Sequence, residues 1–242
     1  MKKIILGVLF TCALLSYLPA QTLGGFLKKA ESKVLGKDVK LSKEEIGEGL
    51  KEALNEGVGK AVSFLSAENG YYESPYKILL PKEAQQVIAK VKAVPGFGDV
   101  EEKMNKLVNR AAEDAATKAK PIFVKAIKKM TFKDAMNILM GEKNAATQYL
   151  DNTTRKNLFS AFMPVIQTSL DKVKAREYWR TVVKAHNKLP FVKDVTPELD
   201  AYVTTNALNG MFKLVEKKEL DIRGNQSSRT TDLLTKVFSQ QD

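Results

Sequence analysis

The chain has 242 residues, with 39 lysines and arginines, 28 aspartates and glutamates, and a formal net charge of +11. It contains one cysteine and one histidine, which argues against disulfide bonds, thiolate nucleophiles, cysteine–histidine zinc sites and di-iron sites with two Glu-x-x-His repeats. The excess of positive charge favours anionic partners such as acidic lipid headgroups, polyanionic polymers or an acidic protein, although a solubilising lysine coat has the same composition.

The first twenty residues are typical of a secretory signal peptide. Lys2 and Lys3 form a basic start, Ile4–Leu15 is an apolar run, and a short segment ends at Ala20. Because the apolar run is shorter than the roughly 20 residues that span a bilayer, export is favoured over a membrane anchor. We expect residues 1–20 to be removed and residues 21–242 to form a single helical domain without a transmembrane span.

The only cysteine, Cys12, lies inside this signal-like segment. Lipidation of Cys12 is the less favoured alternative, because Thr11 is larger than the residue that usually precedes a lipidated cysteine and the apolar lead is short. Removal of Lys2 and Lys3 leaves 37 basic against 28 acidic residues, so the mature charge is +9. Export, together with the lack of a compact basic motif, argues against nucleic acid as a partner.

Apolar residues recur at spacings of three and four through most of the remaining chain, which predicts an all-α bundle of about eight to ten helices. Kinks are expected at Pro121 and Pro164, and at most a short extended segment at 76–80, between Pro75 and Pro81. The predicted helical stretches are 22–36, 42–66, 82–94, 99–119, 121–130, 131–141, 144–150, 153–170, 176–189, 196–220 and 231–238.

Several helix starts carry sequence signals of their own. Ser42 with Glu45 and Thr131 with Asp134 have the spacing of a capping box. Asp99 is expected to cap the central helix, and the triplet at 196–198, Thr-Pro-Glu, is the strongest helix start in the chain.

Small residues predict close packing at two places. In the central helix, Met104–Ala119, five of eight inward positions are alanine. The helix at 42–66 contains Gly47, Gly49, Gly57 and Gly59, each of which costs up to about 1 kcal/mol relative to alanine, so close contact with another helix is the expected compensation. A phosphate-binding loop is rejected because no strand precedes these glycines and no lysine–serine pair follows them.

Charged residues on the central helix leave two interpretations open. Arg110 and Asp114, like Asp114 and Lys118, are four residues apart and could form plain surface pairs. Alternatively, the central helix and the C-terminal region meet in a buried, mutually satisfied polar network. The members of this candidate polar cluster are Asn109, Arg110, Glu113, Glu216, Glu219, Arg223 and Arg229. An enzyme would use Glu113 or Glu219 as a base beside Arg110 or Arg223.

The most basic part of the chain follows the central helix and is the candidate contact with an anionic surface. Its lysines are Lys118, Lys120, Lys125, Lys128, Lys129 and Lys133. His186 is interpreted as a surface or half-buried residue, and no metal or cofactor site is predicted. Ser169 and Lys172 have the Ser-x-x-Lys spacing of some acyl enzymes, but the companion motifs are absent.

Six blocks of sequence, in order, resemble the bacterial exported domain-of-unknown-function family 4197. They are GLKEAL at Gly49–Leu54, KILLP at Lys77–Pro81, NRAAEDA at Asn109–Ala115, AATQYL at Ala145–Leu150, YVTTNALNGMF at Tyr202–Phe212 and DIR at Asp221–Arg223. The resemblance implies an all-helical, single-domain envelope protein and carries no catalytic assignment.

These observations favour a non-catalytic binding or scaffolding module exported to the periplasm or cell envelope. Its partner would be an anionic envelope component or another envelope protein. Two alternatives stay open: an enzyme built on carboxylates and arginines, and a peripheral binder of anionic lipid or another polyanion.

Overall fold

The computed structural model describes residues 42–193 and 199–239, and within these ranges the chain is all-α, with nine α-helices and no strand, as predicted. The predicted signal peptide, the stretch 22–36 and the helix start at 196–198 lie outside the described residues. The elements are α2 (Lys43–Leu65), α3 (Lys82–Val91), α4 (Val100–Ala116), α5 (Ala119–Lys129), α6 (Phe132–Leu139), α7 (Ala145–Lys172), α8 (Ala175–Asn187), α9 (Asp200–Gly224), the 3-10 turn η1 (Gln226–Ser228) and α10 (Asp232–Phe238).

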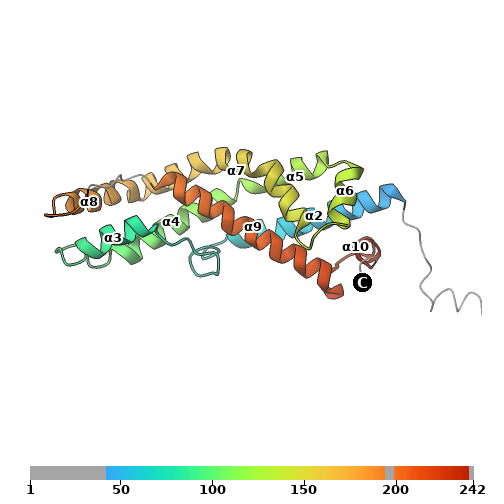
Figure 1. The fold of residues 1–242 in the computed structure, drawn as a ribbon, viewed down its shortest axis with the longest axis horizontal. Helices are drawn as coiled ribbons and strands as arrows, with labels where there is room; N and C mark the ends of the chain where they lie inside the picture. Colours follow the sequence, from blue (N-terminus) through green and yellow to red (C-terminus); the bar gives the residue numbers. More distant parts are fainter. Residues whose placement is uncertain (1–41, 194–198, 240–242) are drawn as a thin grey trace, which may run out of the picture. The chain divides into compact units, whose positions relative to one another are not determined.

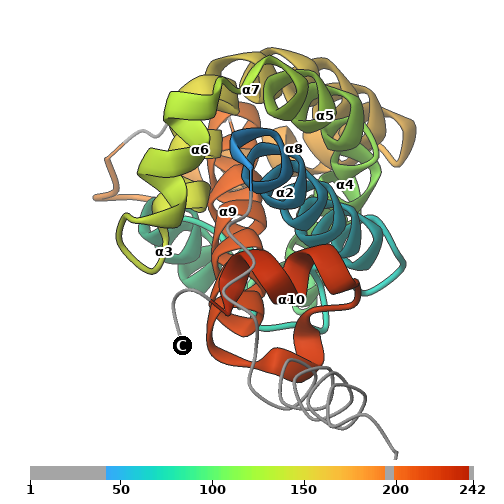
Figure 2. The same ribbon diagram turned by 90° about the vertical axis from the view of Figure 1, so that its right-hand side faces the viewer.

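The two longest helices, α7 and α9, pack against each other and organise the rest of the bundle (Figure 1). Helix α4 packs along α7, while α3 and α8 pair at one end. At the other end, α2 contacts α5, α6, α9 and α10, and these helices face the viewer in Figure 2. None of the described helices is both long and apolar enough to cross a membrane.

The alanine side of α4 is its packing face, as the sequence predicts. Ala111, Ala112, Ala115 and Ala116 are all buried, and α4 meets both α7 and α9. Because alanine projects only one methyl group, this face fills the interior without holding the neighbouring helices apart.

The central helix was predicted to break at Pro121, but the break lies at Thr117 and Lys118. Pro121 is the third residue of α5. The first four amides of a helix have no intrahelical acceptor, so a proline at this position removes no hydrogen bond. The sequence signal was therefore a helix start, and the expected interruption of the central helix is present but lies three residues before Pro121.

Helix α7 joins two stretches that were predicted as separate helices, 144–150 and 153–170. It runs without interruption from Ala145 to Lys172 and includes Pro164. Pro164 is exposed, as is Ser160 four residues earlier. The Ser160 carbonyl, which cannot be paired with a proline nitrogen, is therefore on the solvent side, where water can satisfy it.

Both predicted capping boxes are present. Ser42 Oγ accepts from the Glu45 amide at 3.1 Å, and the Glu45 carboxylate accepts from the Ser42 amide at 2.8 Å. Thr131 and Asp134 form the same reciprocal pair at the start of α6. Asp99 precedes α4 but makes no side-chain cap, since its backbone (φ −100°, ψ 7°) is not in the extended conformation from which a capping side chain reaches forward.

The glycines of α2 divide into two kinds. A Cβ on Gly49 would lie 2.6 Å from Val237 Cγ2 of α10, and one on Gly57 would lie 3.7 Å from Lys218 Cβ of α9. Around Gly47 and Gly59 a Cβ would meet nothing within 4 Å. Close helix contact therefore explains Gly49, whereas the surroundings of Gly57 would accept a Cβ at an ordinary contact distance and the expectation was wrong for Gly47 and Gly59.

The C-terminal region folds back onto α2. Helix α9 continues to Gly224, four residues past the predicted end at Leu220, and the chain then reaches α10 through η1. Leu234, Val237 and Phe238 are buried where α10 meets α2.

Candidate functional site

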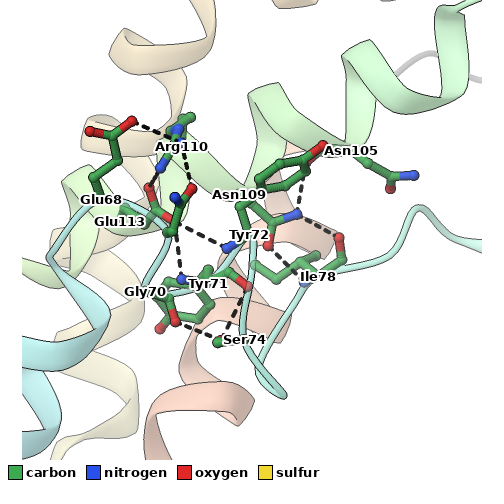
Figure 3. Close-up of polar contacts among 11 residues, drawn as sticks. Glu68, Gly70, Tyr71, Tyr72, Ser74, Ile78, Asn105, Asn109, Arg110 and Glu113 are labelled. Atoms are coloured by element: carbon green, nitrogen blue, oxygen red, sulfur yellow. Dashed lines mark hydrogen bonds and ion pairs between the residues drawn. The ribbon is translucent and has the colours of Figure 1, made fainter.

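Most members of the candidate polar cluster point into the protein, but they form two separate clusters. The first fastens the segment 66–81, between α2 and α3, to α4; we call it the loop cluster (Figure 3). The second joins the ends of α6, α7 and α9; we call it the helix-end cluster.

Glu113 is the centre of the loop cluster and is only 4% exposed. Its Oε1 accepts the backbone amides of Tyr71 at 3.0 Å and Tyr72 at 3.1 Å, and its Oε2 accepts Arg110 Nη1 at 2.6 Å (Figure 3). Two backbone donors and one cation compensate the buried carboxylate. Both oxygens are thereby committed to holding the segment 66–81.

Arg110 extends this cluster to the C-terminal end of α2. Its Nη2 donates to Asn69 Oδ1 at 2.6 Å and to Glu68 Oε1 at 3.1 Å. The hydrogen bond to Glu113, together with the charges of Glu113 and Glu68, raises the pKa of the Arg110 guanidinium above its ordinary value. Arg110 therefore stays charged and clamps three partners at once.

Asn109, one helical turn before Glu113 on α4, binds the same segment at Ile78. Its Oδ1 accepts the Ile78 amide and its Nδ2 donates to the Ile78 carbonyl, both at 2.8 Å. Nδ2 also donates to the Asn105 carbonyl at 2.7 Å. The side chain is fully buried, and it satisfies a stretch of backbone that has no strand or helix partner.

Tyr71 links the loop cluster to α9. Its hydroxyl donates to the Ala207 carbonyl at 2.7 Å, and the ring is completely buried. Burial, with a smaller contribution from the charge of Glu113, raises the pKa of the Tyr71 hydroxyl far above its ordinary value. Tyr71 is therefore a neutral structural anchor.

Glu219 is the centre of the helix-end cluster. Its carboxylate accepts the amides of Ala146 at 3.0 Å and Thr147 at 2.8 Å, and the Thr147 hydroxyl at 2.8 Å. These amides belong to the first turn of α7, whose preceding residue Asn144 provides no side-chain cap. Glu219 thus caps α7 from another helix, at the positive end of the helix dipole.

Arg223 has the complementary position. Its Nε donates to Glu219 Oε1 at 3.0 Å, and its Nη2 donates to the Ile138 carbonyl at 2.7 Å, at the C-terminal end of α6. The cation therefore lies at the negative end of α6 while the anion lies at the positive end of α7. This pair fixes the turn between α6 and α7.

The other two members support the same corner. Glu216 accepts Asn144 Nδ2 at 2.9 Å. Arg229 donates to the carbonyls of Ile222 at 3.1 Å and Arg223 at 2.9 Å, which closes the C-terminal end of α9. The Phe238 ring lies 5.8 Å from the Arg223 guanidinium and 5.9 Å from that of Arg229.

The prediction that the two regions meet in one network was wrong, and distance along α9 explains why. The loop cluster reaches α9 at Ala207, through Tyr71. Glu219 is twelve residues further along, about 18 Å at 1.5 Å per residue. The alternative interpretation, surface pairs of Asp114 with Arg110 and with Lys118, does not hold either. Arg110 pairs with Glu113 and Glu68, and Asp114 accepts the Ser169 hydroxyl at 2.6 Å.

The cavity beside the helix-end cluster is too small for a substrate. Glu219 and Arg223 line it, together with apolar side chains of α2, α9 and α10, and its volume is about 20 Å³. This is room for about one water molecule. The geometry therefore gives Glu219 no reacting partner, just as the hydrogen bonds of Glu113 leave it no free oxygen.

The six basic residues of the candidate surface contact are all exposed. None of them forms an ion pair with an acidic side chain of the described chain, and α5 itself contains no acidic residue. Lys118, Lys125 and Lys129 follow one side of α5 at intervals of seven and four, whereas Lys120 lies about 200° around the helix from Lys118. We call Lys118, Lys125, Lys128, Lys129 and Lys133 the lysine face.

A family model described as "Protein of unknown function (DUF4197)" matches residues 40–239. The chain belongs to this family. No curated protein matches the chain. No solved structure matches it either.

The matched span of this DUF4197 chain contains both polar clusters and the lysine face. It also contains His186, which was expected at the surface or half-buried but is only 3% exposed; its Nδ1 lies 3.1 Å from Asn187 Oδ1. The described residues contain no group of three or more histidine, cysteine, aspartate or glutamate side chains arranged to hold a metal ion.

Sequence reasoning missed residues that complete both polar clusters of this DUF4197 chain. Glu68 and Asn69 supply oxygens to Arg110, and Thr147 supplies a hydroxyl to Glu219. The only available signal was the Asn69-Gly70 pair, which predicts a turn. Asn69 indeed has φ 66°, the left-handed conformation that asparagine tolerates.

Proposed function

We propose that this DUF4197 chain is a non-catalytic binding module of the bacterial cell envelope, which engages an anionic envelope component through the lysine face. The observation that carries the proposal is the row of exposed cations on α5 and the start of α6, none of which forms an ion pair among the described residues, although Lys133 lies close enough to Asp134 to help lower its pKa. Lys118, Lys125 and Lys129 lie on one side of α5, an alignment that a lysine coat serving only solubility would not need.

The non-catalytic part of the proposal rests on the two polar clusters. Catalysis by a carboxylate requires an oxygen within reach of a substrate proton. Glu113 uses its oxygens for two backbone amides and Arg110, and Glu219 uses its oxygens for the start of α7 and Arg223. These carboxylates have structural partners at every position where a base would act.

The cellular location is supported by the sequence alone. A basic start, an apolar run and a small residue at Ala20 favour export, after which a mature charge of +9 would face the anionic polymers and lipids of the envelope. Expression in a bacterial host tests this part: the periplasmic fraction should contain a protein whose intact mass lacks residues 1–20. Full-length protein confined to the cytoplasm would contradict it.

A charge-neutralisation experiment tests the binding face. Replacing Lys125, Lys128 and Lys129 with glutamine should weaken binding to polyphosphate, used as the probe, by about fivefold per lysine. The matched control replaces Lys90, Lys184 and Lys213, which are equally exposed and lie on α3, α8 and α9. Both triple variants change the net charge equally, so equal loss of binding would attribute the affinity to net charge and sink the assignment of this face.

A further inference from the structure

We infer that the anionic partner is a lipid membrane surface, and that the outer side of α6 enters the headgroup region while the lysine face contacts the headgroups. This inference rests on the proposed function and deepens it. It adds an apolar contact to the electrostatic one, and it names one class of partner.

The outer side of α6 carries an exposed stripe that mixes methionine with polar residues, and Met140 is its exposed apolar member. Lys133, Met136, Asn137 and Met140 are spaced at three, four and seven residues, so they share one side of the helix. Met140 is 74% exposed, although methionine is usually buried. The opposite side, with Ala135, Ile138 and Leu139, is buried against the bundle, so the stripe is not part of the packing face of α6.

The stripe and the lysine face meet at one corner of the bundle. Only Met130 and Thr131 separate the last turn of α5, with Lys128 and Lys129, from the first turn of α6, with Lys133. Figures 1 and 2 both place α5 and α6 on the outside of the bundle, at the end where α2 begins. Cations and exposed apolar atoms therefore share one accessible region.

The other charged groups near the stripe are compatible with an anionic surface. Asp134 is committed to Thr131, whose amide and hydroxyl it accepts at 2.9 Å and 2.7 Å. Beyond Met140, the exposed Glu142 is followed directly by the exposed Lys143, so this pair adds no net charge. Lysines therefore outnumber acidic residues from α5 to Lys143, while the neighbouring start of α2 contributes the exposed acids Glu44, Glu45 and Glu48.

The combination of chemistries favours lipid over the alternatives. A hydrated polyanion is recognised by charge alone, and an exposed methionine adds nothing to its binding. A membrane interface takes up both a basic face and the apolar side chains beside it. Each lysine near an anionic bilayer contributes about 1 kcal/mol, and a flexible, unbranched methionine can enter the headgroup region without a shaped pocket.

The test compares the full chain and its Met140→Gln variant on vesicles of phosphatidylglycerol with phosphatidylcholine and on polyphosphate. Met140→Gln should weaken vesicle binding about three- to tenfold and leave polyphosphate binding unchanged, because only the bilayer buries the side chain. The matched control is Leu79→Gln, since Leu79 is 56% exposed on the segment 66–81. It should bind both probes like the unaltered chain.

A spectroscopic measurement checks insertion directly. An environment-sensitive dye is attached through Met140→Cys in a Cys12→Ser background, and a control dye is attached through Lys184→Cys on α8. The dye at position 140 should shift to the blue on the anionic vesicles, and the dye at position 184 should not. Neither dye should shift on pure phosphatidylcholine vesicles, because the lysine face then finds no net negative charge.

The outcomes separate this inference from the proposed function. If the full chain binds neither polyphosphate nor anionic vesicles, the proposed function fails. If it binds polyphosphate but Met140→Gln binds vesicles as well as the unaltered chain, the proposed function stands and the membrane inference is overturned. If Met140→Gln weakens binding to an acidic polypeptide, polyglutamate, as much as it weakens vesicle binding, a protein surface replaces lipid as the partner and the inference is again overturned.

Discussion

Asn109 on α4 pairs with both backbone polar groups of Ile78, 31 positions earlier in the chain, through two hydrogen bonds of 2.8 Å. The side chain thus acts as a one-residue strand partner for a segment that has no regular structure of its own. Four residues further along α4, Glu113 accepts the amides of Tyr71 and Tyr72. Helix α4 therefore fixes the whole segment 66–81 from one side.

Asn109→Asp should destabilise the protein by roughly 2–4 kcal/mol, because the change replaces a buried donor by an acceptor facing two carbonyls. Urea unfolding followed by circular dichroism measures this. Asn152→Asp is the matched control, since Asn152 is exposed on α7, and it should stay within about 0.5 kcal/mol of the unaltered protein. Equal stability of the two variants would show that the pairing with Ile78 contributes nothing.

Glu113→Gln should loosen the segment 66–81 before it affects the rest of the bundle. Glutamine has a single acceptor oxygen, so it cannot serve the two amides and Arg110 together, and we expect a loss of about 2–3 kcal/mol. Amide hydrogen exchange should show lost protection at Tyr71 and Tyr72. Glu102→Gln, an exposed change on the same helix, is the control. Retained protection at both amides in Glu113→Gln would contradict the role given to this carboxylate.

Gly49→Ala and Gly47→Ala should have opposite effects, although both replace a glycine in α2. A methyl group on Gly49 would overlap Val237 on α10, so we expect a loss of about 1–3 kcal/mol. Gly47 has open space around it, and alanine there should add up to about 1 kcal/mol through helix propensity. Thermal unfolding measures both. A shared direction of change would mean that propensity, not the contact with α10, decides the effect at Gly49.

The capping box at the start of α6 should give a pH-dependent contribution to stability. Hydrogen bonds from the Thr131 side chain and backbone hold the pKa of Asp134 below its ordinary value of 3.8. Because the folded-state pKa is the lower one, the carboxylate stabilises the protein above pH 3.8, and this contribution is lost as the pH falls through the folded-state pKa.

Asp134→Ala should therefore lower the free energy of unfolding by about 0.5–1 kcal/mol at neutral pH, and this gap should shrink below pH 3.8. Unfolding curves across the pH range measure it. In a Thr131→Ala background, Asp134→Ala should lower the free energy of unfolding by less at neutral pH, because the Thr131 hydroxyl no longer donates to Asp134. A gap that stays constant as the pH falls would rule out the carboxylate as its source.

Local patterns in the sequence predicted the elements of this fold well. The all-α class, the alanine packing face of α4 and the capping boxes at Ser42 and Thr131 all depend on residues within one or two turns of each other. The lysine face was also identified from the sequence, as a run of exposed cations, and its partner stays a prediction. Helix boundaries near proline were predicted less well, because Pro121 can start a helix as readily as end one.

The two polar clusters show which parts of a site the sequence alone could predict. The sequence identified Asn109, Arg110 and Glu113 as well as Glu219 and Arg223, because charged and amide side chains on inward-facing helix positions require partners. It could not identify the distant partners, several of which are backbone groups 31 to 85 positions away in the chain. Only the packing of α4 against the segment 66–81, and of α9 against the ends of α6 and α7, decided that these residues form two separate clusters.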